Sequence, residues 1–206
     1  MLALFYPFLR IAVAAAGLLL VLPALAADGV EGLLNEVHWG ESSQGLARQF
    51  GSEAVQLPRP LDFGDSYAEV VLRDKTLGGV PVAVFFQTDK ETHGLKRIQL
   101  QPLFHERNPR AFRAIAAALD RQYDRPDQIC VTPPVPAAGY QAAVEERWRH
   151  DDEMISAIFR DTTLEAFEGC LYGPASGWCG LHGQILVRIA PLTHAVTGCA
   201  PPSHPE

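Results

Sequence analysis

The sequence predicts an α+β protein made of two tandem α-β-β-β repeats, with an antiparallel sheet and the helices on one face. Three observations predict this fold class. One stretch of the chain resembles a later stretch at a constant spacing. Each copy begins with an amphipathic helical pattern. Each copy then continues with three runs of alternating apolar and polar residues, which are typical of half-buried strands.

The repeat is visible in pairs of similar residues that lie 73 positions apart. Leu46-Ala47-Arg48-Gln49-Phe50 matches Leu119-Asp120-Arg121-Gln122-Tyr123, and further pairs at this spacing are Tyr67 with Tyr140, Val71 with Val144 and Phe86 with Phe159. After Thr162 the spacing grows to 89, so that Ile98 and Leu100 match Val187 and Ile189. The sequence therefore predicts repeat 1 at 27–107, repeat 2 at 108–199 with an insertion at 164–182, and a disordered tail at 200–206.

A secretory signal peptide is predicted for residues 1–26. Arg10 supplies the positive charge, Ile11–Leu22 the apolar run, and Ala24-Leu25-Ala26 the small side chains that signal peptidase requires. Pro23 and this cleavage site disfavour the alternative, an uncleaved membrane anchor. We therefore expect a periplasmic or secreted mature protein without stable membrane insertion.

Each repeat is expected to open with a helix. In the first, Ser42 or Ser43 is a suitable N-cap, and Leu46 and Phe50 lie one turn apart. In the second, Asn108 is the N-cap and Pro109 suits the first helical position, where its missing N–H costs nothing. The apolar stripe of this helix comprises Phe112, Ile115, Ala116, Leu119 and Tyr123. A proline-containing connection is predicted after each helix, at Leu57–Phe63 and at Val131–Ala137.

Three strands follow each connection. The predicted strands are Tyr67–Arg73, Val80–Thr88 and Gly94–Gln101 in the first repeat, and Ala142–Arg149, Met154–Asp161 and Gly183–Ala190 in the second. Gly78-Gly79 indicates a hairpin turn. The simplest assembly is a six-stranded sheet, or two three-stranded sheets side by side, whose second face meets solvent or a partner.

The charge balance limits the kinds of partner, and the cysteines indicate which disulfides can form. The chain has 24 acidic and 17 basic residues, and this acidic balance disfavours nucleic acid as a partner. Four cysteines in an oxidising compartment allow three pairings. Cys170 with Cys179 closes a short glycine-rich loop, which leaves Cys130 with Cys199. The alternative reading, a metal site at Cys179 and His182, lacks a second closely spaced pair of ligands.

No catalytic motif stands out, and we expect no cofactor and no metal. His150, Asp151 and Asp152 form the densest polar cluster, at a predicted turn between strands. Asp is a common turn residue, so a solvated turn is favoured over a metal or hydrolytic site.

The second face of the sheet is the better candidate for function. It collects residues of opposite parity to the core, and arginines beside apolar side chains are typical of protein-binding surfaces. The alternative is a merely solubilising face. The candidate binding residues are Phe85, Arg97, Gln99, Arg147, Arg149, Ile158, Arg160 and Arg188, with Gln87 of the same parity.

The tandem pattern, together with Trp39-Gly40, Leu46 and Phe50-Gly51 around the first helix, resembles a group of exported repeat proteins. This group contains the β-lactamase inhibitory protein and the small lipoprotein of the outer-membrane barrel-assembly machine. The chain lacks the lipid-attachment cysteine of the latter. The resemblance implies a binding module.

The expected function is therefore that of an exported, non-catalytic binding protein of the bacterial envelope, whose partner is an envelope or secreted protein. Two alternatives stay open. One is an exported hydrolase or metal-dependent enzyme that uses His150, Asp151 and Asp152. The other is a carrier of a small ligand held between the helices and the sheet.

Overall fold

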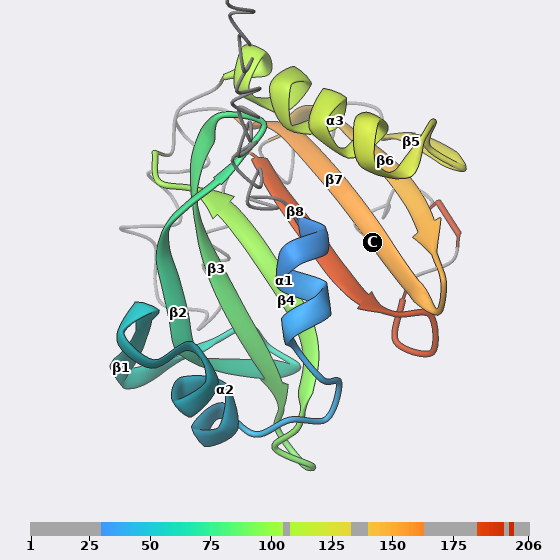
Figure 1. Ribbon diagram of the computed structural model, residues 1–206. Coiled ribbons are helices and arrows are strands. Elements are labelled where there is room, and N and C mark those ends of the chain that lie inside the picture. Colours follow the sequence, from blue (N-terminus) through green and yellow to red (C-terminus); the bar gives the residue numbers. More distant parts are fainter. Residues whose placement is uncertain (1–29, 105–107, 133–139, 163–184, 196–197, 200–206) are drawn as a thin grey trace, which may run out of the picture.

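One eight-stranded antiparallel sheet runs through the computed structural model, in the order β1-β2-β3-β4-β8-β7-β6-β5 (Figure 1). The structure describes residues 30–104, 108–132, 140–162, 185–195 and 198–199. The strands are β1 (Ala54–Asp62), β2 (Ser66–Leu77), β3 (Val80–Asp89), β4 (Leu95–Pro102), β5 (Gln128–Thr132), β6 (Tyr140–His150), β7 (Glu153–Thr162) and β8 (Ile185–Pro191). The helices are α1 (Val30–Glu36), α2 (Ser43–Phe50), α3 (Pro109–Tyr123) and a 3₁₀ turn, η1 (Gly51–Glu53).

The predicted fold class was wrong. Two α-β-β-β repeats contain six strands, whereas a single eight-stranded sheet dominates the described chain and its helices are few and short. The six predicted strands all exist within a few residues of their predicted bounds. The two missing strands, β1 and β5, lie at the two edges of the sheet.

Most of strand β1 coincides with the proline-containing connection predicted at Leu57–Phe63, and that prediction was wrong. Pro58 and Pro60 fall within β1, and its register with β2 is regular up to Gln56, breaks, and resumes at Leu61. Proline has no N–H to donate, so it is tolerated on an edge strand or at a bulge and not in the middle of a sheet. The edge position and the irregular register together explain why this segment pairs despite its sequence.

The predicted helix starts are confirmed. The Ser42 hydroxyl accepts a hydrogen bond from the backbone N–H of Gly45, at 3.2 Å, and caps α2. The Asn108 side chain accepts one from the N–H of Ala111, at 3.0 Å, and caps α3 ahead of Pro109. Helix α1 was not predicted. It packs Leu33 and Leu34 against the core.

Both predicted hairpin turns are present. Gly78 and Gly79 join β2 to β3 with φ values of 61° and 76°, which suit glycine. Asp151 and Asp152 join β6 to β7, with Asp151 at φ 49°. Asp tolerates this left-handed conformation better than most residues do.

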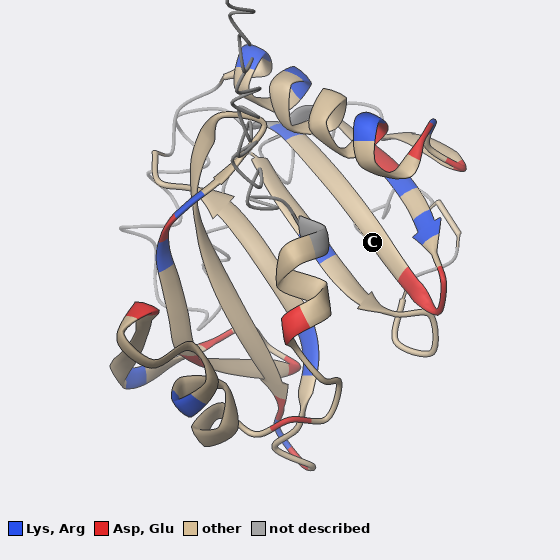
Figure 2. Ribbon diagram, in the orientation of Figure 1, with Lys and Arg blue, Asp and Glu red and all other residues tan. Residues whose placement is uncertain are grey.

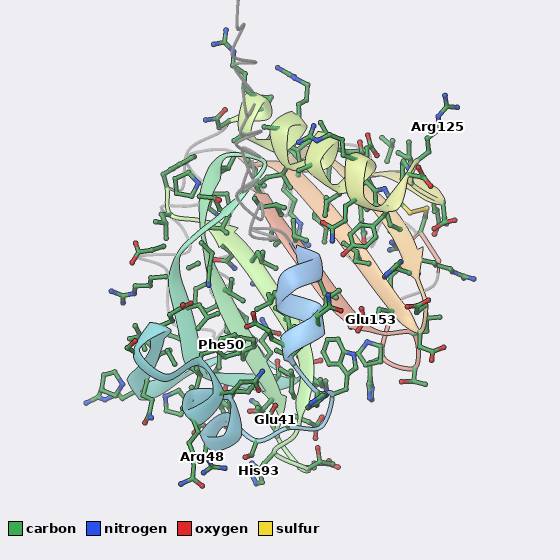
Figure 3. The ribbon with its side chains drawn as sticks, in the orientation of Figure 1. Glu41, Arg48, Phe50, His93, Arg125 and Glu153 are labelled. Atoms are coloured by element: carbon green, nitrogen blue, oxygen red, sulfur yellow. A yellow bond between two sulfur atoms is a disulfide. The ribbon has the colours of Figure 1, made fainter. Side chains whose placement is uncertain are left out.

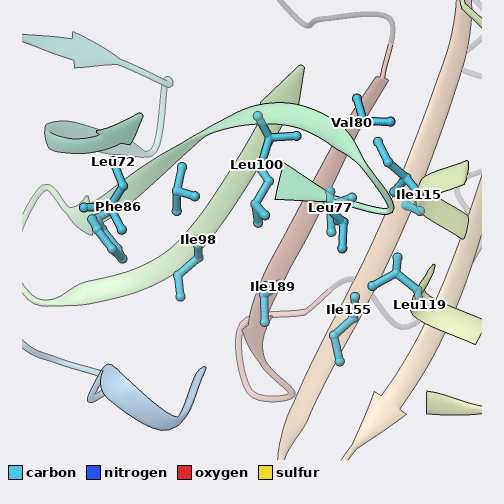
Figure 4. Close-up of a cluster of buried hydrophobic side chains, with 14 of the residues drawn as sticks. Leu72, Leu77, Val80, Phe86, Ile98, Leu100, Ile115, Leu119, Ile155 and Ile189 are labelled. Atoms are coloured by element: carbon cyan, nitrogen blue, oxygen red, sulfur yellow. The ribbon is translucent and has the colours of Figure 1, made fainter. Parts of the chain in front are cut away.

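The apolar core lies between the helices and one face of the sheet, which we call the core face (Figure 4). Val84, Ile98, Val187 and Ile155 from four adjacent strands belong to it. From the helices come Leu46 and Phe50 of α2 and Phe112, Ile115 and Leu119 of α3. The core is continuous across the sheet, so the two halves of the chain do not fold around separate interiors.

The two halves meet where β4 pairs with β8. Ile98 pairs with Ile189, Gln99 with Arg188, and Leu100 with Val187. Outward from this seam, each half contributes four strands in the reverse of their chain order. The internal duplication, with its boundaries at 27–107 and 108–199, stays a prediction.

A disulfide joins Cys130 of β5 to Cys199. The sequence allowed three pairings and favoured the one that contains this pair, so this part of the prediction is confirmed. Cys170 and Cys179, the signal peptide, the insertion and the tail lie outside the described residues. Within the described part of the chain, no helix has the length and apolarity needed to cross a membrane.

Candidate functional site

The predicted binding residues come together on the face of the sheet opposite the core, which we call the far face. Residues paired directly across antiparallel strands point to the same side. The register aligns Phe85 of β3 with Gln99 of β4, Gln99 with Arg188 of β8, and Arg188 with Ser156 of β7. The same parity along β4, β6 and β7 adds Arg97, Arg147, Arg149, Ile158 and Arg160.

The expectation that this face is open was wrong over its centre. Gln99 is fully buried and Ile158 is only 6% exposed. Their neighbours Leu186, at 0%, and Met154, at 5%, are buried as well. The sheet is thus buried on both sides around the β4–β8 seam. Period-2 alternation assigns residues to faces but says nothing about how much of each face is covered.

Arg147 is buried, and each nitrogen of its guanidinium donates a hydrogen bond within the described chain. Its guanidinium forms a bidentate pair with Glu145, at 2.8 and 3.0 Å, and donates to the carbonyl of Gly198 at 3.0 Å. Gly198 precedes the disulfide cysteine Cys199. Arg147 therefore holds the chain near the disulfide, and as a buried side chain it is not presented to a partner. Arg149, by contrast, is exposed at the end of β6.

Four predicted residues remain partly exposed, namely Phe85, Arg97, Arg160 and Arg188, and we call them the basic patch. Three adjacent strands, β4, β8 and β7, supply its arginines. Arg97 and Arg160 both lie close enough to Arg188 for their charges to act on it. An overall acidic chain thus brings three arginines close together on one face of the sheet.

Arg97 is compensated by a carboxylate. Its Nη2 donates to Oδ1 of Asp65, at 2.6 Å, and to the Ser66 hydroxyl, at 3.0 Å. Burial raises the pKa of Asp65, but Arg97 and Lys96 outweigh it and lower that pKa below its usual value. Nε of Arg97 donates to Oε1 of the buried Gln87 at 2.5 Å.

Arg188 has no such ion pair within the described part of the chain. Its Nε donates to Oε1 of Gln99 at 3.0 Å, and no carboxylate of the described chain lies within ion-pair distance of it. Burial, together with the positive charges of Arg97 and Arg160, lowers the pKa of Arg188 to about 10. The charges of Glu145 and Asp65 oppose this shift without outweighing it. Arg188 is therefore a poorly hydrated cation without an ion-pair partner among the described residues.

Comparisons of the chain with protein-family models, with curated proteins and with solved structures found no match. The function must therefore be argued from the geometry of this chain alone.

A second site lies at the turn between β6 and β7. His150, Asp151, Asp152 and Glu153 line a cavity of about 330 Å³ together with Leu34, Asn35, Trp39 and Tyr123. Trp39 donates its indole N–H to Glu153 at 2.7 Å, and the rings of Tyr123 and His150 lie 5.0 Å apart. Figure 3 labels Glu153, and in Figure 2 the turn between β6 and β7 is red for its acidic residues.

The polar cluster predicted at His150 is thus part of a solvent-facing cleft. Asp151 is exposed, and His150 lies 3.8 Å from its carboxylate. Among the described residues no group of three or more His, Cys, Asp or Glu side chains could hold a metal ion. Sequence reasoning missed Trp39 and Tyr123 as partners of this turn, because α1, α3 and the hairpin are far apart in the chain.

Sequence reasoning also missed Asp65 and Ser66, which hold Arg97. Asp65 directly precedes β2 and Ser66 is its first residue, and only the pairing of β2, β3 and β4 brings them beside β4. The parity pattern did assign Gln87 to the far face, and the structure adds its role as the acceptor for Arg97 and Ser66.

Proposed function

We propose that the protein is an exported, non-catalytic binding protein of the bacterial envelope, which contacts an acidic partner protein through the basic patch. One observation carries this proposal: arginines of three adjacent strands converge beside Phe85, and Arg188 among them has no carboxylate partner in the described chain. Complementary charge steers association and selects partners. Arginine and aromatic side chains are enriched where binding energy concentrates.

Export is part of the same proposal. Disulfides persist in oxidising compartments such as the periplasm, and the Cys130–Cys199 bond fits a protein that works there or beyond. The predicted signal peptide supports the same location.

Affinity capture from envelope extract tests the proposal. The bait is the tagged mature protein, compared with a variant carrying Arg97→Glu, Arg160→Glu and Arg188→Glu. The control carries Arg110→Glu, Arg113→Glu and Arg121→Glu, which make the same change in charge at exposed positions of α3. Circular dichroism and thermal melts establish that each bait is folded, and Arg→Gln versions replace any that is not.

We expect the wild type and the α3 control to retain the same partner, with a strong dependence on salt, and the patch variant to lose it. Equal capture by the patch variant would refute binding through the far face.

The cavity at His150 supports a second candidate, a hydrolytic or ligand-binding function at the β6–β7 turn. The same capture experiment separates the two when it includes a bait with His150→Ala, Asp151→Asn and Asp152→Asn. This bait keeps the partner if the basic patch binds it, and loses the partner if the cavity does.

A further inference from the structure

Two glutamines on the far face are held in one orientation by their arginine neighbours. Arg97 donates to Oε1 of Gln87, and Arg188 donates to Oε1 of Gln99. Arginine has donors and no acceptor. Each glutamine must therefore turn its carbonyl oxygen toward the arginine and its amide nitrogen away, because the flipped amide would set donor against donor.

This orientation leaves both amide nitrogens without an acceptor. Gln87 and Gln99 are each 0% exposed, and among the described residues Nε2 of each has no hydrogen-bond partner. A buried donor without an acceptor is unfavourable, and native structures rarely keep one. Two of them, from neighbouring strands of the same face, call for an explanation.

The charge beside these donors points to what is missing. Arg97 has the carboxylate of Asp65 at 2.6 Å, whereas within the described chain the Arg188 side chain makes one hydrogen bond, to Gln99. The two terminal nitrogens of Arg188 thus remain as donors beside the unpaired amide of Gln99. Arg160, which lowers the pKa of Arg188 together with Arg97, adds positive charge next to them.

We infer that Arg188 and Gln99 form a binding site for an oxyanion, which accepts hydrogen bonds from the Arg188 guanidinium and from Nε2 of Gln99. A carboxylate, a phosphate or a sulfate group has the required charge and the several lone pairs. The inference rests on the proposed function, since it names the chemistry that the basic patch recognises. Arg188 is only partly buried, so solvent reaches its guanidinium, and binding at the fully buried amide of Gln99 requires the side chains that cover it to move.

Thermal melts and titration calorimetry with sodium phosphate, sulfate and acetate test this site in the full mature protein. Sodium chloride at equal ionic strength is the reference. The decisive variant is Arg188→Met with Gln99→Met, which replaces both hydrogen-bonding partners with apolar side chains and so leaves no new unpaired group. The matched control is Gln101→Met, two residues along β4 on the same face and 7% exposed.

We expect at least one of the three anions to bind the wild type and the Gln101→Met control with a stoichiometry of one, and to raise their melting temperature above the chloride reference. The double variant should stay folded and bind at least tenfold more weakly. Phosphate and sulfate stabilise proteins in general through exclusion from the surface, and the response of the double variant measures this general effect.

Equal binding and stabilisation of the wild type and the double variant would overturn the inference, as would the absence of binding by all three anions. The comparison of acetate with phosphate and sulfate also distinguishes the possible sources of the bound group. Acetate binding indicates an acidic side chain of a partner, whereas binding of phosphate or sulfate alone indicates a free or attached phosphate or sulfate group. If no anion binds while the patch variant still loses its partner, the oxyanion site falls and the proposed function stands.

Discussion

Two ionisable side chains of the sheet have shifted pKa values for the same reason, the loss of hydration. On the far face, burial and the charges of Arg97 and Arg160 lower the pKa of Arg188 to about 10. On β6, burial and the nearby carboxylate of Asp120 raise the pKa of Glu146. In both cases the folded protein disfavours the charged form. Each of these charges therefore costs the folded state some free energy.

The cost at Glu146 can be measured. We expect Glu146→Gln to stabilise the protein at neutral pH by less than about 1 kcal/mol, because the side chain is partly exposed. Below the ordinary pKa of 4.5, the carboxyl is protonated in both the folded and the unfolded state, so the substitution gains little there. Above that value the unfolded state ionises first, and the gain grows with pH until it levels off above the raised folded pKa.

Urea unfolding of the two proteins across this pH range checks the expectation. Glu69→Gln, at an exposed position of β2, is the control and should show no such gain. A difference between Glu146→Gln and the wild type that stays constant with pH, or shrinks as pH rises, would contradict the assignment.

At the scale of elements, the β2–β3 turn is the clearest case in which local and tertiary requirements coincide. Both of its glycines have positive φ values, which suit a two-residue hairpin turn. Only Gly78 also lies against another element. A Cβ atom there would overlap the backbone carbonyl of Ala114 in α3, whereas a Cβ at Gly79 would meet nothing within 4 Å.

The two glycines therefore form a matched pair of test sites. Gly79→Ala should lower the free energy of unfolding by about 1–2 kcal/mol through backbone strain alone. Gly78→Ala should cost about 1–3 kcal/mol more, because α3 must also shift. Chemical denaturation of both variants measures the difference, and equal losses would show that α3 does not pack against this turn.

At the scale of the whole molecule, two features join distant parts of the chain. One is the β4–β8 seam, across which the core is continuous. The other is the Cys130–Cys199 disulfide, which spans 69 residues and ties the last described segment to the edge strand β5. Arg147 reinforces that tie by donating to the Gly198 carbonyl.

Removing the disulfide tests how much the C-terminal tie contributes. We expect Cys130→Ser with Cys199→Ser to lower the free energy of unfolding by about 2–4 kcal/mol, chiefly because the unfolded chain gains freedom. Guanidinium denaturation under non-reducing conditions measures the loss. An unchanged midpoint would mean that these two thiols are not bonded in the native protein.

The sequence by itself determined the local elements and some of the positions that matter. Helix caps, glycine turns and period-2 alternation depend on residues a few positions apart, so Ser42, Asn108, Gly78-Gly79 and six strands could be predicted. Alternation also assigned Gln99 and Arg188 to one face.

Only the tertiary structure decided the rest, because it depends on which segments become neighbours. β1, despite its prolines, and β5 pair as strands at the two edges of the sheet. They raise the number of strands from the predicted six to eight. Pairing of β4 with β8 set Gln99 beside Arg188, and the covering of the far face buried Gln99 while leaving Arg188 partly exposed. Periodicity gives the direction of a side chain, whereas burial and the lack of an acceptor are properties of its surroundings.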